Sequence, residues 1–417
     1  MAKIQAPRGA SDLYPPDSEV LAEVEATALR LFDRYGYRAI ETPTFEHTEV
    51  FLRTYGETSE VVLDKEMYTF EDRRGRSLSL RPEGTAPVAR AFVEHNLGSK
   101  LGLPVRLFYS GWFFRYERPQ KARQRQFHQM GAECVGSPEP LVDAELIVLA
   151  HEFFEQLGLT PELQLNSMGC VADRQRYGAV LREALADKVD DMCDDCHLRV
   201  EKNPLRVFDC KVPGCKKIVR GDIPPITEYL CEECRVHYRA VQDILEVLGV
   251  AWKDEPTLVR GFDYYTRTVY EFQAPEIGAR PTVCAGGRYD GLVEQLGGPT
   301  TPASGFAIGT TATIEALGTK RPVRGWHPDV YIVWLGDLSG VALAAATDLR
   351  RAGLRVTVSD EPKSMKAQLR AADKAGAIRA VIVGPDEVAR RAATVRELGT
   401  GEQREVLLDR LVTELAP

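Results

Sequence analysis

The stretch VRLFYSGWFFRYERPQKARQRQFHQMGAECVG, Val105 to Gly136, predicts a long β-hairpin. Its first arm is rich in branched and aromatic residues, which favour strands, and its second arm follows a long basic loop. An earlier stretch, MYTFEDRRGRSLSLRPEG, resembles another hairpin that turns at Arg74 and Gly75. Together these strands predict an antiparallel sheet.

The loop of the long hairpin concentrates positive charge. One acid, Glu117, stands among five cations, which are Arg115, Arg118, Lys121, Arg123 and Arg125. Because guanidinium groups match phosphate oxygens in a bidentate way, such a loop fits a triphosphate or an RNA end. A solvated basic loop without a ligand is the alternative that composition leaves open.

The remaining patterns predict an α+β protein. A helix from Ser18 to Tyr35 leads into a strand, and residues from about 171 to 252 form a helical, cysteine-rich insertion. Strands then resume and end near SGFAIG, so that residues 1–325 make one domain. The segment 329–417 alternates strands and helices, which is typical of a small α/β domain with a mostly parallel sheet.

Composition is that of an ordinary globular protein, with 417 residues, 44% hydrophobic and 27% charged. No run approaches the roughly 18 apolar residues of a membrane span, and the first residues lack the apolar core of a signal peptide. We therefore expect a cytoplasmic chain without a membrane partner. Its net charge of −8 means that an RNA partner must be held by a local basic surface.

The cysteines are clustered. Six of the nine cysteines lie in one stretch, CDDCHLRVEKNPLRVFDCKVPGCKKIVRGDIPPITEYLCEEC. They are Cys193, Cys196, Cys210, Cys215, Cys231 and Cys234. Two CxxC pairs can close a tetrahedral thiolate site, which predicts Zn²⁺ on Cys193, Cys196, Cys231 and Cys234. The spacing between the pairs is long, so Cys210 and Cys215 replacing one pair, or reduced thiols without metal, remain alternatives. Haem attachment to CDDCH is not expected without an export signal.

The segment RYERPQKARQRQFHQ, Arg115 to Gln129, resembles motif 2 of the class II aminoacyl-tRNA synthetases, in its histidyl-tRNA synthetase version. DKEMYTFEDRRGRSLSLRPEGTAPVAR, LVRGFDYYTRTVYEF and CAGGRYDGLVEQLGG are similar to further segments of that family, and the C-terminal SMKAQLRAADKAGA to its anticodon-binding domain. The likeness covers nearly the whole chain. It implies an antiparallel-sheet catalytic domain with a helical insertion that lies over the tRNA acceptor arm.

The resemblance implies activation of L-histidine by ATP, taken with Mg²⁺, and transfer of the histidyl group to the 3′ end of tRNA(His). It assigns Arg115 and Arg260 to the α-phosphate and the amino-acid carboxylate, Arg260 standing where other class II enzymes use a metal ion. Preorganised cations there are expected to carry most of the rate. The other ATP contacts implied are Glu117 to the adenine amino group, Phe127 stacking on the base, and Arg123 and Arg125 on the outer phosphates.

Selection of histidine is a hydrogen-bonding problem, because a neutral imidazole offers one donor and one acceptor. The resemblance assigns the ring to Glu133 and Tyr264, and the α-amino group and carboxylate to Glu83, Thr85 and Gln129. Tyr265 and Tyr289 are expected to line the pocket, although core packing is the alternative for any one tyrosine. The family's helix–strand opening, motif 1, further implies a homodimer.

One segment departs from the family pattern. After SGFAIG the family has an arginine that lies against adenine, whereas this chain reads Thr311 and Ala312, with no arginine before Arg321. This departure gives some support to a second hypothesis, a synthetase-like regulatory subunit of histidine biosynthesis that does not charge tRNA. Against it stand Arg115, Arg260, Glu83, the basic loop and the C-terminal domain, which such regulators lack.

Overall fold

The computed structural model describes residues 3–55, 66–117, 119, 124–221, 223–259, 264–278, 282–321 and 325–416. The chain divides into two compact units, Met1–Val323 and Arg324–Pro417. None of the helices within these ranges is long and apolar enough to cross a membrane.

An eight-stranded sheet is the framework of the first unit, in the order β1-β5-β6-β11-β10-β9-β7-β8. The long hairpin predicted from the sequence is confirmed, since β5 and β6 pair antiparallel from Val105↔Val135 to Phe114↔Gln126. The strands are β1 Arg38–Ala39, β5 Val105–Phe114, β6 Gln126–Val135, β7 Glu162–Ser167, β8 Lys253–Asp254, β9 Thr266–Gln273, β10 Thr282–Arg288 and β11 Ala303–Gly309.

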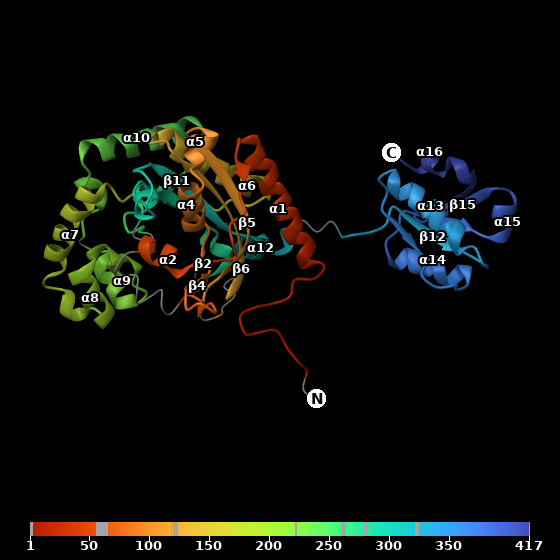
Figure 1. The fold of residues 1–417 in the computed structure, drawn as a ribbon, viewed down its shortest axis with the longest axis horizontal. Helices are drawn as coiled ribbons and strands as arrows, with labels where there is room; N and C mark the ends of the chain where they lie inside the picture. The colour runs from red at the N-terminus through yellow and green to blue at the C-terminus, as the bar shows by residue number, and fades with distance from the viewer. Residues whose placement is uncertain are drawn as a thin grey trace. The chain divides into compact units, whose positions relative to one another are not determined.

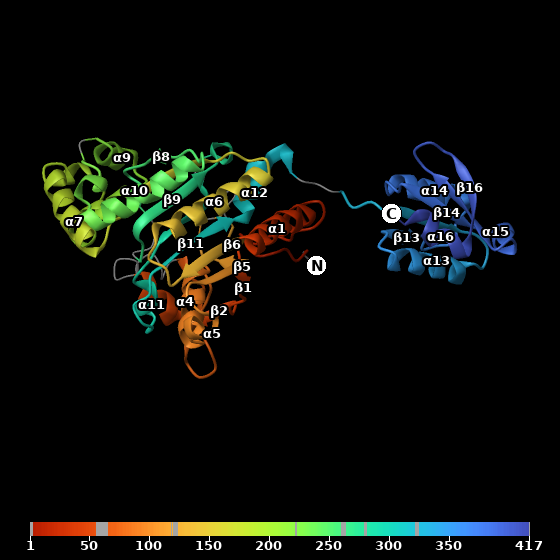
Figure 2. The same cartoon turned by 90° about the horizontal axis from the view of Figure 1, so that it is seen from above.

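Alternation along β6 separates the two faces of this sheet. Met130, Ala132 and Cys134 are buried in the largest apolar cluster, beneath the helices of one face. Successive strand residues point to opposite sides, so Gln129, Gly131 and Glu133 face the other way. The covering helices are α1 Asp17–Arg34, α6 Pro140–Gln156, α10 Glu232–Val247 and α12 Thr310–Leu317. Figure 2 shows α6, α10 and α12 along this side.

Shorter elements lie on the opposite face. A second apolar cluster joins α4, Thr85–Glu94, and α11, Leu292–Gln295, to residues of β5 and to the tyrosines near β9 and β10. The predicted early hairpin is confirmed as β3 and β4, and the turn at Gly75 has φ +73°. The remaining elements here are α2 Thr48–Tyr55, α5 Leu97–Leu101, β2 Phe45–His47, β3 Thr69–Glu71 and β4 Ser77–Leu80, with β2-β4-β3 forming a small sheet.

A buried charged junction ties the sheet to its helical layer. Asp143 of α6 accepts hydrogen bonds from Arg288 of β10, at 3.1 Å from Nε and 2.8 Å from Nη2. His237 Nε2 of α10 lies 2.7 Å from the same carboxylate. Burial opposes ionisation, yet the Arg288 guanidinium and the His237 ring hold the pKa of Asp143 below its ordinary value. The junction is therefore an ion pair that depends on both partners.

Asp143→Ala is expected to destabilise the chain by about 3–5 kcal/mol, because it removes the buried carboxylate that accepts from Nε and Nη2 of the fully buried Arg288 and leaves that charge only its partly exposed partner Asp290 among the carboxylates of the described residues. Equilibrium denaturation in urea measures the change. The matched control is Asp243→Ala on α10, which breaks an exposed ion pair with Arg239 and is expected to leave stability unchanged. Equal effects of the two substitutions would contradict this account of the junction.

Helices of the insertion gather at one end of the first unit (Figure 1). They are α7 Val171–Leu185, α8 Asp194–Lys202 and α9 Pro213–Val219, with short 3-10 turns at Val189–Asp191, Pro204–Asp209 and Ile226–Tyr229. The helix that follows, α10, packs through Tyr238, Val241 and Leu245 into the main apolar cluster. It therefore belongs to the layer over the sheet.

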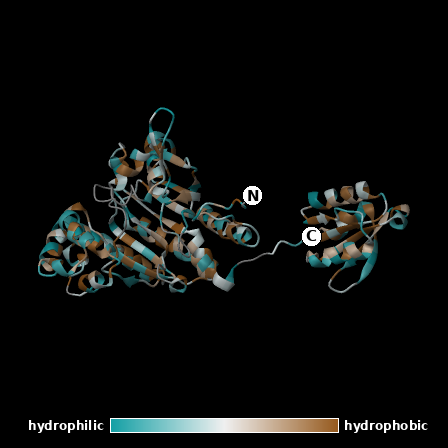
Figure 3. Ribbon diagram, turned by 90° about the horizontal axis from the view of Figure 1, so that it is seen from below, coloured by the Kyte–Doolittle hydropathy of each residue, from teal (hydrophilic) through white to brown (hydrophobic). Residues whose placement is uncertain are grey.

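The second unit is a five-stranded sheet in the order β13-β12-β14-β15-β16. The first three strands named are parallel, as predicted, whereas β14, β15 and β16 pair antiparallel. Apolar residues concentrate on the strands and inner helix faces (Figure 3). The elements are β12 Val330–Trp334, α13 Ser339–Arg351, β13 Val356–Val358, α14 Met365–Lys374, β14 Arg379–Val383, α15 Pro385–Ala389, β15 Ala392–Glu397, β16 Gln403–Leu407 and α16 Leu411–Leu415.

Candidate active site

The face of the sheet opposite to α1, α6, α10 and α12 carries a buried carboxyl group, that of Glu133 on β6. Its exposed fraction is 1%. On β11, the residue paired with it is Gly305, and a Cβ at that position would overlap the Glu133 carboxylate. Glycine at 305 therefore makes the space that the carboxylate fills.

Two hydroxyl groups hold this carboxylate in place. Thr85 Oγ1 at the start of α4 donates to Glu133 Oε1 at 2.7 Å, and the Tyr289 hydroxyl donates to Oε2. Burial nevertheless dominates and raises the pKa of Glu133 to about 8, against the lowering effect of these two hydrogen bonds. Protonated or ionised, the carboxyl group keeps acceptor capacity beyond these two hydrogen bonds, so it can also bind a ligand N–H.

The raised pKa predicts a pH-dependent stability. Between about pH 4.5 and pH 8 the folded chain keeps a proton on Glu133 that the unfolded chain releases, so this contribution to stability is present at low pH and is lost as pH rises through 8. Urea midpoints of wild type are expected to fall more steeply from pH 6 to pH 9 than those of Glu133→Gln. Parallel pH profiles for the two proteins would contradict a raised pKa.

Glu83 lies at the beginning of α4, beside Thr85. Its two oxygens accept hydrogen bonds from the backbone N–H groups of Thr85, at 2.6 Å, and Ala86, at 2.8 Å. Burial raises the pKa of Glu83, and these backbone hydrogen bonds oppose the rise. The carboxylate thus caps the first turn of the helix and orients Thr85 toward Glu133.

Three of the sequence-predicted tyrosines form one wall. The ring of Tyr264 lies 4.7 Å from that of Tyr265 and 5.7 Å from that of Tyr289, centre to centre. A fourth ring, Tyr109 of β5, was not predicted as a site residue. It pairs with Gly131, where a Cβ would collide with its hydroxyl end. Strand alternation could have identified it, because Tyr109 shares the face of Glu133.

Arg115 stands where β5 ends. Its Nε donates to the carbonyl oxygen of Pro82 at 2.9 Å, and its guanidinium carbon lies 5.3 Å from the centre of the Phe127 ring. One Nη approaches the Glu117 carboxylate at 3.9 Å. The structure therefore brings together three residues that the family resemblance assigned to ATP, and the carbonyl of Pro82 fixes the Nε side of the arginine fork.

An N-terminal segment crosses the base of the basic loop. Arg125 and Gln126 donate their backbone N–H groups to the carbonyl oxygen of Gly9, and the Arg125 guanidinium lies 4.0 Å from the Tyr116 ring centre. At φ +88°, with Arg125 side-chain atoms packed against it, position 9 suits only glycine. This contact was not predictable from the sequence, because the residues around Gly9 match no secondary-structure pattern.

Several predicted residues lie outside the described part of the chain. They are Arg260 and Asp263 in the segment that precedes β9, and Arg118, Lys121 and Arg123 in the basic segment between β5 and β6. Their assignments stay predictions.

Two other predicted positions are described. Gln129 lies on the Glu133 face of β6, and its Oε1 is buried without a hydrogen-bond partner among the described residues. Such an orphaned acceptor is expected where a ligand supplies the missing donor. Ala312, which stands where the family has an arginine, packs against the large apolar cluster. No cationic side chain extends from this position.

The metal site predicted on Cys193, Cys196, Cys231 and Cys234 is wrong in its grouping. The chain between the two CxxC pairs folds back, so Cys210 and Cys215 meet the first pair. The second pair begins α10, and it lies instead beside Cys170 and Asp173 at the start of α7. Sequence spacing could not distinguish these groupings, because both alternatives contain complete CxxC pairs.

A groove of about 410 Å³ separates the insertion from the tyrosine wall. One side reaches Tyr265 and Val259, and Arg174 Nη1 donates to the carbonyl oxygen of Tyr265 at 2.8 Å. The cations that line the groove are Arg174, Arg182, Lys202 and Arg206. This arrangement suits a polyanion that approaches the site from the insertion.

Comparison with known proteins agrees with these features. The family model for histidyl-tRNA synthetase matches residues 9–191 and 225–313, and that for the anticodon binding domain matches 329–416. The chain is 45% identical to the histidine–tRNA ligase of Halothermothrix orenii, over 99% of both chains. It is 47% identical to that of Moorella thermoacetica, over 97% of this chain and 96% of the relative.

A solved structure supports the same assignment. The apo S. aureus histidyl-tRNA synthetase aligns over 100% of both chains, with a TM-score of 0.83 and 33% identity. Its fold therefore extends through the catalytic unit and the C-terminal unit alike. Full-length relatives, two family models in order and a shared fold together establish that the chain belongs to the histidyl-tRNA synthetase family.

Proposed function

We propose that this chain is a histidine–tRNA ligase, which activates L-histidine with ATP and transfers the histidyl group to the 3′ end of tRNA(His). The observation that carries this proposal is the buried Glu133 carboxyl group, fixed by Thr85 and Tyr289 in a space that Gly305 leaves open. A buried acceptor of this kind selects a ligand with a matching N–H, and rejects a side chain without one.

Glu133 and Tyr264 hold the imidazole ring in this proposal. Both side chains are buried, and Tyr264 belongs to the wall of tyrosines, so little water competes for their hydrogen bonds to the ring. Glu83, Thr85 and Gln129 hold the α-amino group and the carboxylate of the amino acid. The free acceptor of Gln129 supports its part, whereas Thr85 also orients Glu133. Tyr265 and Tyr289 complete the pocket.

In the activation step, a carboxylate oxygen of histidine attacks the α-phosphorus of ATP, and the bond to the leaving pyrophosphate breaks. Negative charge grows on the α-phosphate oxygens, so cations already in place stabilise the transition state. Arg115 supplies one of them: Pro82 anchors its Nε, which leaves the Nη groups to meet the phosphate and carboxylate. We assign Arg260 to the opposite side of the same phosphate, from the family resemblance.

ATP enters as its Mg²⁺ complex, and the ion arrives with the substrate. Phe127 stacks on adenine and Glu117 accepts from its amino group, while Arg123 and Arg125 bind the outer phosphates. The Phe127 ring lies next to the Arg115 guanidinium, which supports binding of adenine and of the α-phosphate at adjacent positions. No arginine lies at position 312, so we propose that adenine is held without this family contact.

In the second step, the terminal ribose hydroxyl of tRNA(His) attacks the histidyl carbonyl, and AMP leaves. The cationic groove between Tyr265 and the insertion supports an approach of the acceptor end from that side. Residues 329–416 match the anticodon-binding model, and we propose that they bind the anticodon. We propose that the enzyme works in the cytoplasm.

A homodimer is also part of the proposal. Phe45 and Phe70 of the small sheet are 52% and 43% exposed, and their rings lie 6.2 Å apart. Such an exposed apolar pair near the motif 1 segment supports an interface. Light scattering of the purified chain measures the mass, and a monomer at micromolar concentration would contradict the dimer.

Amino-acid-dependent exchange of pyrophosphate into ATP tests the activation step. Exchange is expected with histidine and not with glutamine or phenylalanine, which lack an imidazole. The regulatory-subunit hypothesis is not favoured, because the ligase relatives match this chain along nearly its full length. Absence of histidine-dependent exchange would contradict the proposed activity.

A further inference from the structure

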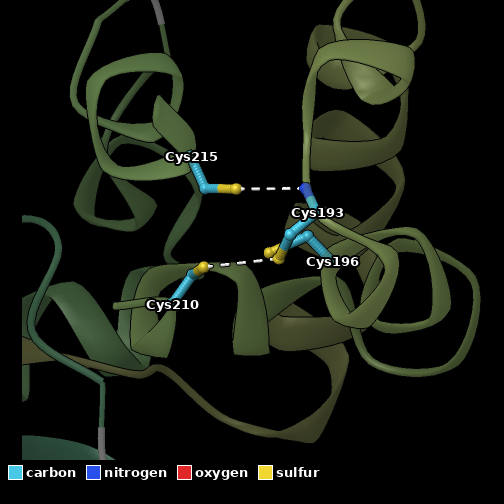
Figure 4. Close-up of side chains that lie close together, drawn as sticks. All are labelled: Cys193, Cys196, Cys210 and Cys215. Carbon is cyan, nitrogen blue, oxygen red and sulfur yellow. Dashed lines mark hydrogen bonds between the residues drawn. The ribbon is translucent and has the colours of Figure 1, made fainter. Parts of the chain in front are cut away.

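Four cysteines of the insertion converge on one point (Figure 4). Cys193 and Cys196 come from the beginning of α8, and Cys210 and Cys215 come from the segment that leads into α9 and from α9 itself. Their sulfur atoms all lie within 4.8 Å of one another. Cys196, Cys210 and Cys215 are buried, and Cys193 is partly buried.

The spacing of these sulfurs fits a metal centre. A tetrahedral Zn²⁺ with Zn–S distances near 2.3 Å separates its sulfurs by about 3.8 Å. Cys193 Sγ and Cys210 Sγ lie 3.8 Å apart, far beyond the bond length of a disulfide. The backbone N–H of Cys193 points at Cys215 Sγ, 3.3 Å away, and such a donor stabilises a thiolate. We infer that Cys193, Cys196, Cys210 and Cys215 bind one Zn²⁺ ion.

The insertion needs such a cross-link, because its own apolar core is small. Among the described residues, the buried members of that core beside three of the cysteines are Leu185, Met192, Val207 and Val219. Small units with little apolar surface commonly gain their stability from a structural metal. The histidyl-tRNA synthetase model does not match residues 192–224, so the site lies in a segment outside the shared family core.

The ion would also fix one wall of the cationic groove. Lys202, Asn203 and Arg206 line that groove, and all three lie between Cys196 and Cys210. Holding both ends of this segment on one metal keeps its cations opposite Tyr265. The metal is structural on this account and takes no part in the chemistry.

The second CxxC pair provides a matched control. Cys231 and Cys234 lie with Cys170 and Asp173, also within 4.8 Å. There, however, Asp173 already accepts the backbone N–H groups of Cys170, at 3.1 Å, and Cys231, at 3.0 Å, and it pairs with Arg176. Hydrogen bonds among protein groups account for this cluster, and it contains three thiols in place of four.

Zinc measured by atomic spectroscopy in the full-length chain, purified without a histidine tag, tests the site. Cys210→Ser is expected to contain one equivalent less than wild type. Cys231→Ser, equally a cysteine-to-serine change in the insertion, is expected to keep the equivalent that Cys210→Ser loses. Wild-type zinc content in Cys210→Ser, or a loss of that equivalent from Cys231→Ser alone, would overturn the proposal.

A measurement on wild type avoids any dependence on the folding of variants. Bound zinc is expected to protect all four cysteines from alkylation by iodoacetamide, and removal of zinc by a chelator is expected to expose them, as read by mass spectrometry of the peptides. Alkylation at the same rate before and after chelation would show that no metal is held there.

Discussion

Arg115→Ala is expected to slow histidine-dependent pyrophosphate exchange by about 10²- to 10³-fold, while the chain stays folded. The side chain lies at the end of β5, where the carbonyl of Pro82 anchors its Nε and one Nη lies 3.9 Å from the Glu117 carboxylate. In the proposed mechanism its Nη donors meet the negative charge that grows on the α-phosphate. Alanine removes the Nη donors, so the transition state of activation loses the stabilisation that they provide.

Arg115→Lys separates the effect of the positive charge on the exchange rate from the effect of the guanidinium geometry. Lysine keeps one positive charge but loses the planar fork, so an intermediate rate is expected if bidentate contact matters. Substitution of Arg106 provides a control. Arg106 is on the same strand, lies outside the candidate site and forms an ion pair with Glu145 at 3.0 Å. Arg106→Ala is expected to leave exchange unchanged. Near-normal exchange in Arg115→Ala would contradict its role in activation.

Glu133→Ala is expected to raise the KM for histidine roughly 10- to 100-fold, because a buried hydrogen-bonding group is lost and its partners remain unpaired. Thr85 and Tyr289 both donate to the Glu133 carboxyl group, so its removal also leaves these two hydroxyl groups without that acceptor. The KM for ATP is expected to change little. Steady-state pyrophosphate exchange, with each substrate varied in turn, measures both constants.

Glu133→Gln is the informative companion variant. It retains the shape and one acceptor, so a smaller rise in the histidine KM is expected than with alanine. Equal losses of histidine and ATP binding in Glu133→Ala would indicate a collapsed site. An unchanged histidine KM would exclude Glu133 from recognition of the ring.

Local patterns predicted the long hairpin of the sheet, whereas the residues of the candidate site were assigned from the family resemblance. The arms of the Val105–Gly136 hairpin carry strand-forming residues on both sides of a basic loop, and the structure pairs them throughout. A glutamate such as Glu133 is unusual in a strand whose two faces are both covered, because its carboxyl group is then buried. Family resemblance then supplied its role, which composition alone does not give.

Long-range packing set the limits of prediction. The grouping of the cysteines depends on how residues 197–230 fold back, and spacing along the chain does not fix that path. Likewise, the contact of Gly9 with Arg125 joins segments far apart in sequence. In the second unit, β15 and β16 form an antiparallel pair, although the alternating strand–helix pattern had indicated only a terminal helix after β14.

Transfer of radiolabelled histidine to a tRNA(His) transcript, with ATP and Mg²⁺, tests the central claim most directly. Wild type is expected to form acid-precipitable histidyl-tRNA, and Arg115→Ala is expected to form it at least about 10²-fold more slowly. A folded wild-type chain that binds histidine but transfers none to tRNA(His) would contradict the account, since that is the behaviour of a synthetase-like regulatory subunit.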